Sequence, residues 1–190
     1  MDGHVHIFAE PGQVILTGAD VTLHVHSTNL GAFKNYDRAL DYLCRHGKSG
    51  RICVLEDDYI YCNSLNDKLK SKVRTKETFG YFNLFTNGYH PGIGDKMIKP
   101  GWNNVDYGFE AAWGVAYVFD RAFVPRLRAH EVYQATMNEK NRVIDGAVSE
   151  VCKRLKLNMW YHNPSLIYSI GFSSTLGNEF KTDGYRFRGK

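Results

Sequence analysis

An apolar run that ends in three consecutive carboxylates is the feature that most restricts the possible folds of this chain. Ile52–Leu55 has the length and the β-branched content of a buried strand. Glu56, Asp57 and Asp58 follow it directly. Carboxylates crowded at the end of a buried strand repel one another and resist the loss of water. A hard cation such as Mg²⁺ or Mn²⁺ removes both penalties, because it prefers oxygen ligands. The alternative is a solvated acidic turn.

Strand and helix patterns alternate around this run, which predicts an α/β fold. Val5–Ala9 and Val21–His26 have the composition of strands, and the second alternates apolar residues with histidines. Apolar residues then recur at helical spacing from about Gly31 until the Gly47–Gly50 segment stops the helix. The sequence therefore predicts two strands, one helix and the acid-tipped strand in that order.

The second half of the chain continues the alternation and contains one long aperiodic segment. Further strands are predicted at Phe79–Phe85, Ala111–Phe119 and Met159–Tyr161, and helices after Asn63, after Asp120 and over Asn141–Leu155. The segment from Asn87 to Gly108 is rich in glycine and aromatic residues and has no period. Loops of this length inside a compact domain are commonly functional, so a substrate-facing lid is predicted. A disordered connection is the alternative.

Composition is that of a globular protein in one domain spanning residues 1–190. No apolar run approaches the length of a membrane span, and no signal peptide is visible, so a cytoplasmic protein with no membrane contact is expected. The four cysteines form no CxxC pair, which favours reduced thiols. The net charge of +4 is concentrated in Lys68–Lys76 and Lys181–Lys190. Such clusters are solvated faces or contacts to nucleic acid, and the sequence does not separate the two.

Four stretches, taken in order, resemble nucleotide-sugar-dependent glycosyltransferases of the GT-A fold. They are Ile7–Gly12, Asn29–Tyr36, Val54–Asp58, and Trp113–Arg121 with Pro164–Ile167 before Gly171. The resemblance covers most of the chain and implies a Rossmann-related central mixed sheet flanked by helices. The chain starts at what resembles the second strand of that fold, so its first strand–helix unit is expected to be missing or shortened.

The resemblance also implies roles for individual residues. Asp58 and Glu56 would hold Mn²⁺ or Mg²⁺ at the diphosphate, and Asp145 would be the general base beside the acceptor. Trp113 and Gly114 would line the acceptor pocket. The implied contacts to the donor are Glu10, Asn29, Gly31, Lys34, Asn35 and Asp57. Each role has an alternative: Trp113 in the core, Asp145 as an ordinary first-turn acid, and Lys34 and Asn35 on the helix surface.

The function implied is transfer of a sugar, with inversion, from a nucleotide-sugar donor such as a UDP-sugar to a hydroxyl acceptor. The acceptor would be a saccharide or a hydroxymethylated DNA base, since similar compact enzymes occur in polysaccharide gene sets and in viruses. One departure is that relatives carry a histidine shortly before the glycine matching Gly171, where this chain has Tyr168 and Ser169. Two alternatives follow: a non-catalytic GT-A domain that binds sugar nucleotide, nucleic acid or a partner, and a phosphohydrolase built on the acids. The sequence leaves the oligomeric state open.

Overall fold

The structure, a computed structural model of the whole chain, describes residues 5–12, 21–55, 59–63, 65–72, 79–86, 99–105, 116–139 and 144–169. The strands are β1 (Val5–Ala9), β2 (Val21–Val25), β3 (Arg51–Leu55), β4 (Tyr59–Tyr61), β5 (Phe79–Asn83), β6 (Gly101–Val105), β7 (Ala116–Asp120), β8 (Asn158–Asn163) and β9 (Ile167–Ser169). The helices are α1 (Ala32–His46), α2 (Leu65–Lys72), α4 (Val124–Ala129), α5 (Glu131–Asn138) and α6 (Ile144–Arg154).

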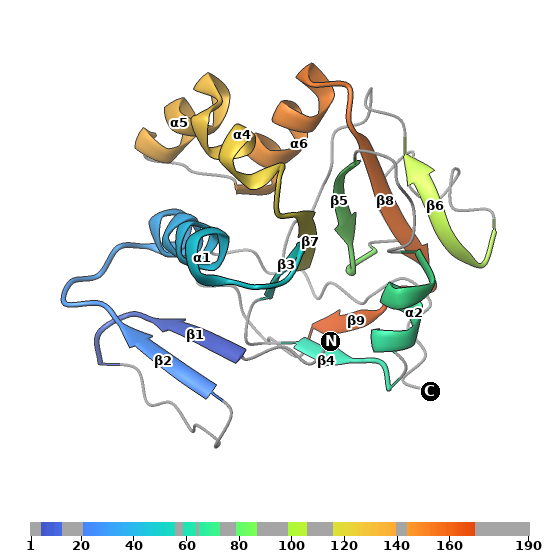
Figure 1. Cartoon of the computed structure of the whole chain (residues 1–190), viewed down its shortest axis with the longest axis horizontal. Coiled ribbons are helices and arrows are strands. Elements are labelled where there is room, and N and C mark those ends of the chain that lie inside the picture. Colours follow the sequence, from blue (N-terminus) through green and yellow to red (C-terminus); the bar gives the residue numbers. More distant parts are fainter. Residues whose placement is uncertain are drawn as a thin grey trace.

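The centre of the molecule is a mixed sheet with the strand order β3-β7-β5-β8-β6 (Figure 1). Strand β5 is parallel to β8, while β7 is antiparallel to both of its neighbours and β6 is antiparallel to β8. Strands β3, β5 and β8 therefore run in one direction. Within the described residues, β1 and β2 form a separate parallel pair and β4 and β9 a separate antiparallel pair. The prediction of a central mixed sheet flanked by helices is confirmed.

Two layers of core cover the two faces of the sheet. One apolar cluster joins the sheet to α1, α4, α5 and α6, and the other joins it to α2 and β9. Strand β7 illustrates the division, because side chains alternate between the faces of a strand. Tyr117 and Phe119 belong to the first cluster, and Ala116 and Val118 belong to the second. All four are fully buried.

Strand β5 contains a close approach to α6 that only glycine permits. A Cβ atom added to Gly80 would lie 2.4 Å from Cys152 Sγ and 3.2 Å from Cys152 Cβ. The pairing of β5 with β8 also shifts between Phe79 and Tyr81. Phe79 and Phe82 consequently pack in the same cluster, although their spacing is not that of a regular strand.

The sequence located most of these elements, and the structure corrects several boundaries. The helix expected from about Gly31 is α1, and the acid-tipped strand is β3. The prediction of a loop for the aperiodic segment was wrong over Gly101–Val105, because these residues form β6 and pair with β8. Strands β4 and β9 were not predicted, because each is only three residues long.

Two further expectations concern cysteines and membranes. Cys44, Cys53, Cys62 and Cys152 are all free, as expected for reduced thiols. Burial raises the pKa of the Cys53 thiol to about 12, so it is protonated and unreactive at neutral pH. None of the helices in the described part of the chain combines the length and the apolar character needed to cross a membrane.

Candidate functional site

The carboxyl ends of the three parallel strands define one edge of the central sheet. Strands β3, β5 and β8 end there at Leu55, Asn83 and Asn163. In open α/β sheets, ligands bind outside the carboxyl ends of the strands. The three predicted acids, Glu56, Asp57 and Asp58, continue directly from Leu55 but lie outside the described residues. Trp113 and Gly114 also lie outside them, a short distance in sequence before Ala116, which pairs with Leu55.

Asp145 stands above this edge, on the helical face of the sheet. It is half-buried in the first turn of α6. Tyr117 on β7 pairs with Asn83 on β5, and Asn83 pairs with Tyr161 on β8. These three residues form a row across the sheet, one position before the end of β3. Burial raises the pKa of Tyr161 to about 12, and the negative charge of the Asp145 carboxylate adds to that rise. The pKa of Tyr117 is raised by burial, then by Tyr161 and Asp145.

A directional chain of hydrogen bonds supports the first turn of α6. Ser149 Oγ donates to the carbonyl oxygen of Asp145 at 2.7 Å. Because a hydroxyl carries one hydrogen, Ser149 must accept from Tyr81 Oη, which is 3.2 Å away. Tyr81 must in turn accept from Tyr161 Oη at 3.0 Å. The direction of every bond is thereby fixed, and the chain ties Asp145 to the sheet.

The amide of Asn83 completes the chain at the carboxyl end of β5. Asn83 Oδ1 accepts from the backbone N–H of Phe85 at 3.0 Å. The Asn83 side chain also forms a hydrogen bond to Tyr161, which opposes the rise in its pKa. Because Tyr161 Oη donates its one hydrogen to Tyr81, it must accept from Asn83, so the amide nitrogen is the group that faces Tyr161. This network was not evident in the sequence, because its members lie on two strands, β5 and β8, and on helix α6.

Substitution of Tyr81 and of its neighbour Tyr117 by phenylalanine is expected to have different effects on stability, because only the Tyr81 hydroxyl has hydrogen-bond partners among the described residues. Tyr81→Phe should lower the free energy of unfolding by about 1–2 kcal/mol, because two buried hydrogen bonds are lost. Tyr117→Phe should be near neutral, because the Tyr117 hydroxyl is buried without a hydrogen-bond partner among the described residues. Denaturation of both variants by urea measures the difference. Equal losses would mean that Tyr117 Oη has a partner in the rest of the chain.

Most of the predicted donor contacts gather at a second corner, where β1 and β2 end and α1 begins. Glu10 Oε2 accepts from the backbone N–H of Leu30 at 2.9 Å, and Asn29 Oδ1 accepts from that of Gly31 at 2.9 Å. Gly31 precedes the first residue of α1 with a φ of 73°, a conformation that suits glycine. These contacts fix the loop that leads into the helix.

Asn35 acts as a support for this corner. Its Nδ2 donates to the carbonyl oxygen of Phe8 at 3.0 Å, and its Oδ1 lies 2.8 Å from His26 Nε2. Both polar atoms of the amide are therefore engaged within the protein. The role of Asn35 as a donor contact stays a prediction. His26 is half-buried and is held against α1 by this contact with Asn35.

Lys34 is separated from this group and lines a cavity between α1 and α5. Over the residues that the structure describes, no cluster of three His, Cys, Asp or Glu side chains is placed to hold a metal ion. The predicted metal ligands are not among those residues. No protein-family model matches the chain, and no curated protein matches it significantly.

Proposed function

We propose that the chain is a metal-dependent glycosyltransferase that moves a sugar from a nucleotide-sugar donor to a hydroxyl acceptor, with inversion. The observation that carries the proposal is the position of Asp145 above the row of Tyr117 and Tyr161. That row lies at the edge of the sheet from which the segment Glu56–Asp58 continues. A base and a group of acids at one strand edge suit a displacement with an anionic leaving group.

The predicted acids have the chemistry required of ligands to Mn²⁺ or Mg²⁺. Glu56 and Asp58 would supply carboxylate oxygens, which are the ligands that these hard cations prefer. When bound, the cation would neutralise charge on the leaving diphosphate. The resemblance to GT-A glycosyltransferases assigns Asp57 to the donor, with a UDP-sugar as the first choice.

Asp145 would accept the proton from the attacking hydroxyl of the acceptor. Its backbone is held by Ser149, while its half-buried carboxylate lies at the start of α6. A general base needs to be within hydrogen-bond reach of the proton that it removes. The position of Asp145 is fixed through its own main chain, and its Oδ1 also accepts from the backbone N–H of Gly146 at 3.0 Å. The acceptor would be a saccharide or a hydroxymethylated DNA base.

A panel of nucleotide sugars, incubated with and without acceptors and with and without Mn²⁺, tests the proposal. Transfer that requires both metal and acceptor is the expected result. Transfer that is unaffected by removal of the metal would reject the assignment of Glu56 and Asp58. Release of free phosphate would favour a phosphohydrolase, and donor binding without turnover would indicate a non-catalytic domain.

Asp58→Asn is expected to abolish metal-dependent binding of a nucleoside diphosphate while leaving the fold intact. The amide keeps the size of the side chain but removes the negative charge that attracts the cation. Calorimetric titration with UDP in the presence of Mn²⁺ measures the effect. Asp67→Asn is the matched control, since Asp67 is an exposed acid on α2. An unchanged affinity for Mn²⁺ in folded Asp58→Asn protein would contradict the assignment.

A further inference from the structure

A cavity of about 350 Å³ lies between α1 and the helices α4 and α5. Its size is at the lower end of the range for ligand pockets, roughly 300–1,000 Å³. It is lined by Leu30, Lys34, Asp37, Arg38, Asp41, Arg128, Met137 and Asn138. Cations outnumber acids in this lining, so the distribution of charge decides what the cavity can hold.

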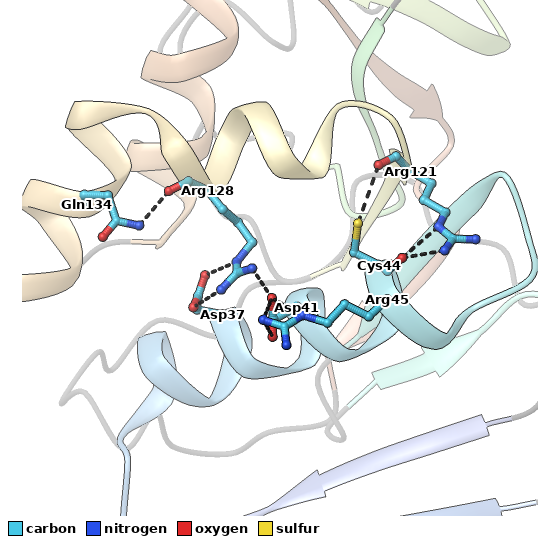
Figure 2. A network of polar contacts seen from close by, with 7 residues as sticks. All are labelled: Asp37, Asp41, Cys44, Arg45, Arg121, Arg128 and Gln134. Carbon is cyan, nitrogen blue, oxygen red and sulfur yellow. Dashed lines mark hydrogen bonds and ion pairs between the residues drawn. The ribbon is translucent and has the colours of Figure 1, made fainter.

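The two acids of the cavity are neutralised by arginines. Arg128 makes a bidentate contact to Asp37, with Nε at 2.7 Å from Oδ1 and Nη2 at 2.9 Å from Oδ2 (Figure 2). The third nitrogen of the same guanidinium, Nη1, bonds Asp41. Arg45 approaches Asp41 from the next turn of α1 at 2.7 Å. Charge-assisted contacts of this kind hold both carboxylates in place and leave little negative charge for a ligand cation.

The two remaining cations of the cavity have no such compensation among the residues that the structure describes. Lys34 and Arg38 lie four residues apart on α1, which places them on the same face of the helix. Both are exposed, and neither forms an ion pair with a residue that the structure describes. Like charges at this spacing destabilise a helix. An anion bound between them would remove that repulsion.

We propose that this cavity binds a phosphate group, carried by a small organic phosphate, between Lys34 and Arg38. A phosphate dianion matches the two positive charges of Lys34 and Arg38, and a guanidinium contacts two phosphate oxygens at once. The first turn of α1 carries no acid, so the positive end of the helix dipole adds to the attraction. Leu30 and Met137 offer an apolar wall to the organic part. The site requires neither a metal nor a sugar and goes beyond the proposed transfer reaction.

Calorimetric titrations in EDTA with inorganic phosphate, phenyl phosphate and malonate test this site. Saturable binding of both phosphates is expected, with phenyl phosphate tighter than inorganic phosphate because of the apolar wall. Lys34→Gln/Arg38→Gln should weaken phenyl phosphate binding roughly tenfold, as expected for two exposed charge contacts. The control is Lys48→Gln/Arg126→Gln, which removes two exposed cations outside the cavity and changes the net charge equally.

Three outcomes would overturn the proposal. They are no saturable phosphate binding by the wild-type chain, equal weakening in both double variants, and malonate binding as tight as that of phosphate. Thermal melts establish that the variants are folded. The Lys34→Gln/Arg38→Gln variant is expected to fold, because it removes a repulsion between like charges on α1. Retained phosphate binding by Asp58→Asn in EDTA would separate this site from the proposed metal site. Either proposal can therefore fail without the other.

Discussion

Replacement of Asp145 by asparagine is expected to reduce kcat by roughly 10²–10⁴-fold, the usual scale for loss of a general base. Asparagine preserves the size of the side chain and an oxygen that can accept from the backbone N–H of Gly146, as Asp145 Oδ1 does at 3.0 Å. The hydrogen bond from Ser149 to the main chain is also unaffected. Donor binding should therefore change far less than turnover, because the base acts only as the acceptor proton is lost.

Steady-state kinetics with a saturating donor and the correct acceptor measure this effect, and calorimetry measures donor affinity. Glu150→Gln is the matched control, since Glu150 is on the same helix but pairs with Arg154 at the surface. Near-normal turnover in Asp145→Asn would show that Asp145 only begins a helix. The search for the base would then move to Glu110 and Asp106, the acids that precede β7 in the sequence.

Replacement of Gly80 by alanine is expected to lower the free energy of unfolding by about 1–3 kcal/mol, the usual cost of overpacking a core. The added Cβ would meet Cys152 Sγ at 2.4 Å, and Cys152 is fully buried, so it has no open space into which to move. For a chain of this size, each kcal/mol corresponds to roughly 2–4 °C in Tm. Thermal and urea denaturation both measure the loss.

A second substitution tests whether contact with Cys152 Sγ causes the loss of stability in Gly80→Ala. Gly80→Ala should cost less in a Cys152→Ala background, because the sulfur that the new methyl group meets is then absent. Gly50→Ala is the control, since nothing lies within 4 Å of a Cβ added at Gly50. A loss that is the same with and without the Cys152 sulfur would mean that α6 does not approach β5 as described.

The sequence was sufficient for elements whose burial repeats at a regular interval. Along α1, Phe33, Ala39 and Leu40 are buried, and they belong to the apolar stripe from which this helix was predicted. Strand β3 was located from its short β-branched run, but the prediction that it is buried was wrong, because β3 is the edge strand of the described sheet and only Ile52 in it is buried. Such patterns record which face of an element is covered, and this information is local.

Only the tertiary structure decided which elements meet. Strand β6 was hidden in a segment rich in glycine and aromatic residues. Its residues become a strand through pairing with β8 and through the packing of Trp102 against Phe82, with ring centroids 5.0 Å apart. The hydrogen bonds that support Asp145 also join distant parts of the chain. Tyr81 bonds Ser149, which is 68 positions away, and Tyr161, which is 80 positions away. Periodicity in the sequence indicates which side chains are buried. The residues that bury them depend on contacts between segments that are distant along the chain. The candidate base was therefore predictable as a residue, whereas its place above the strand edge came from the fold.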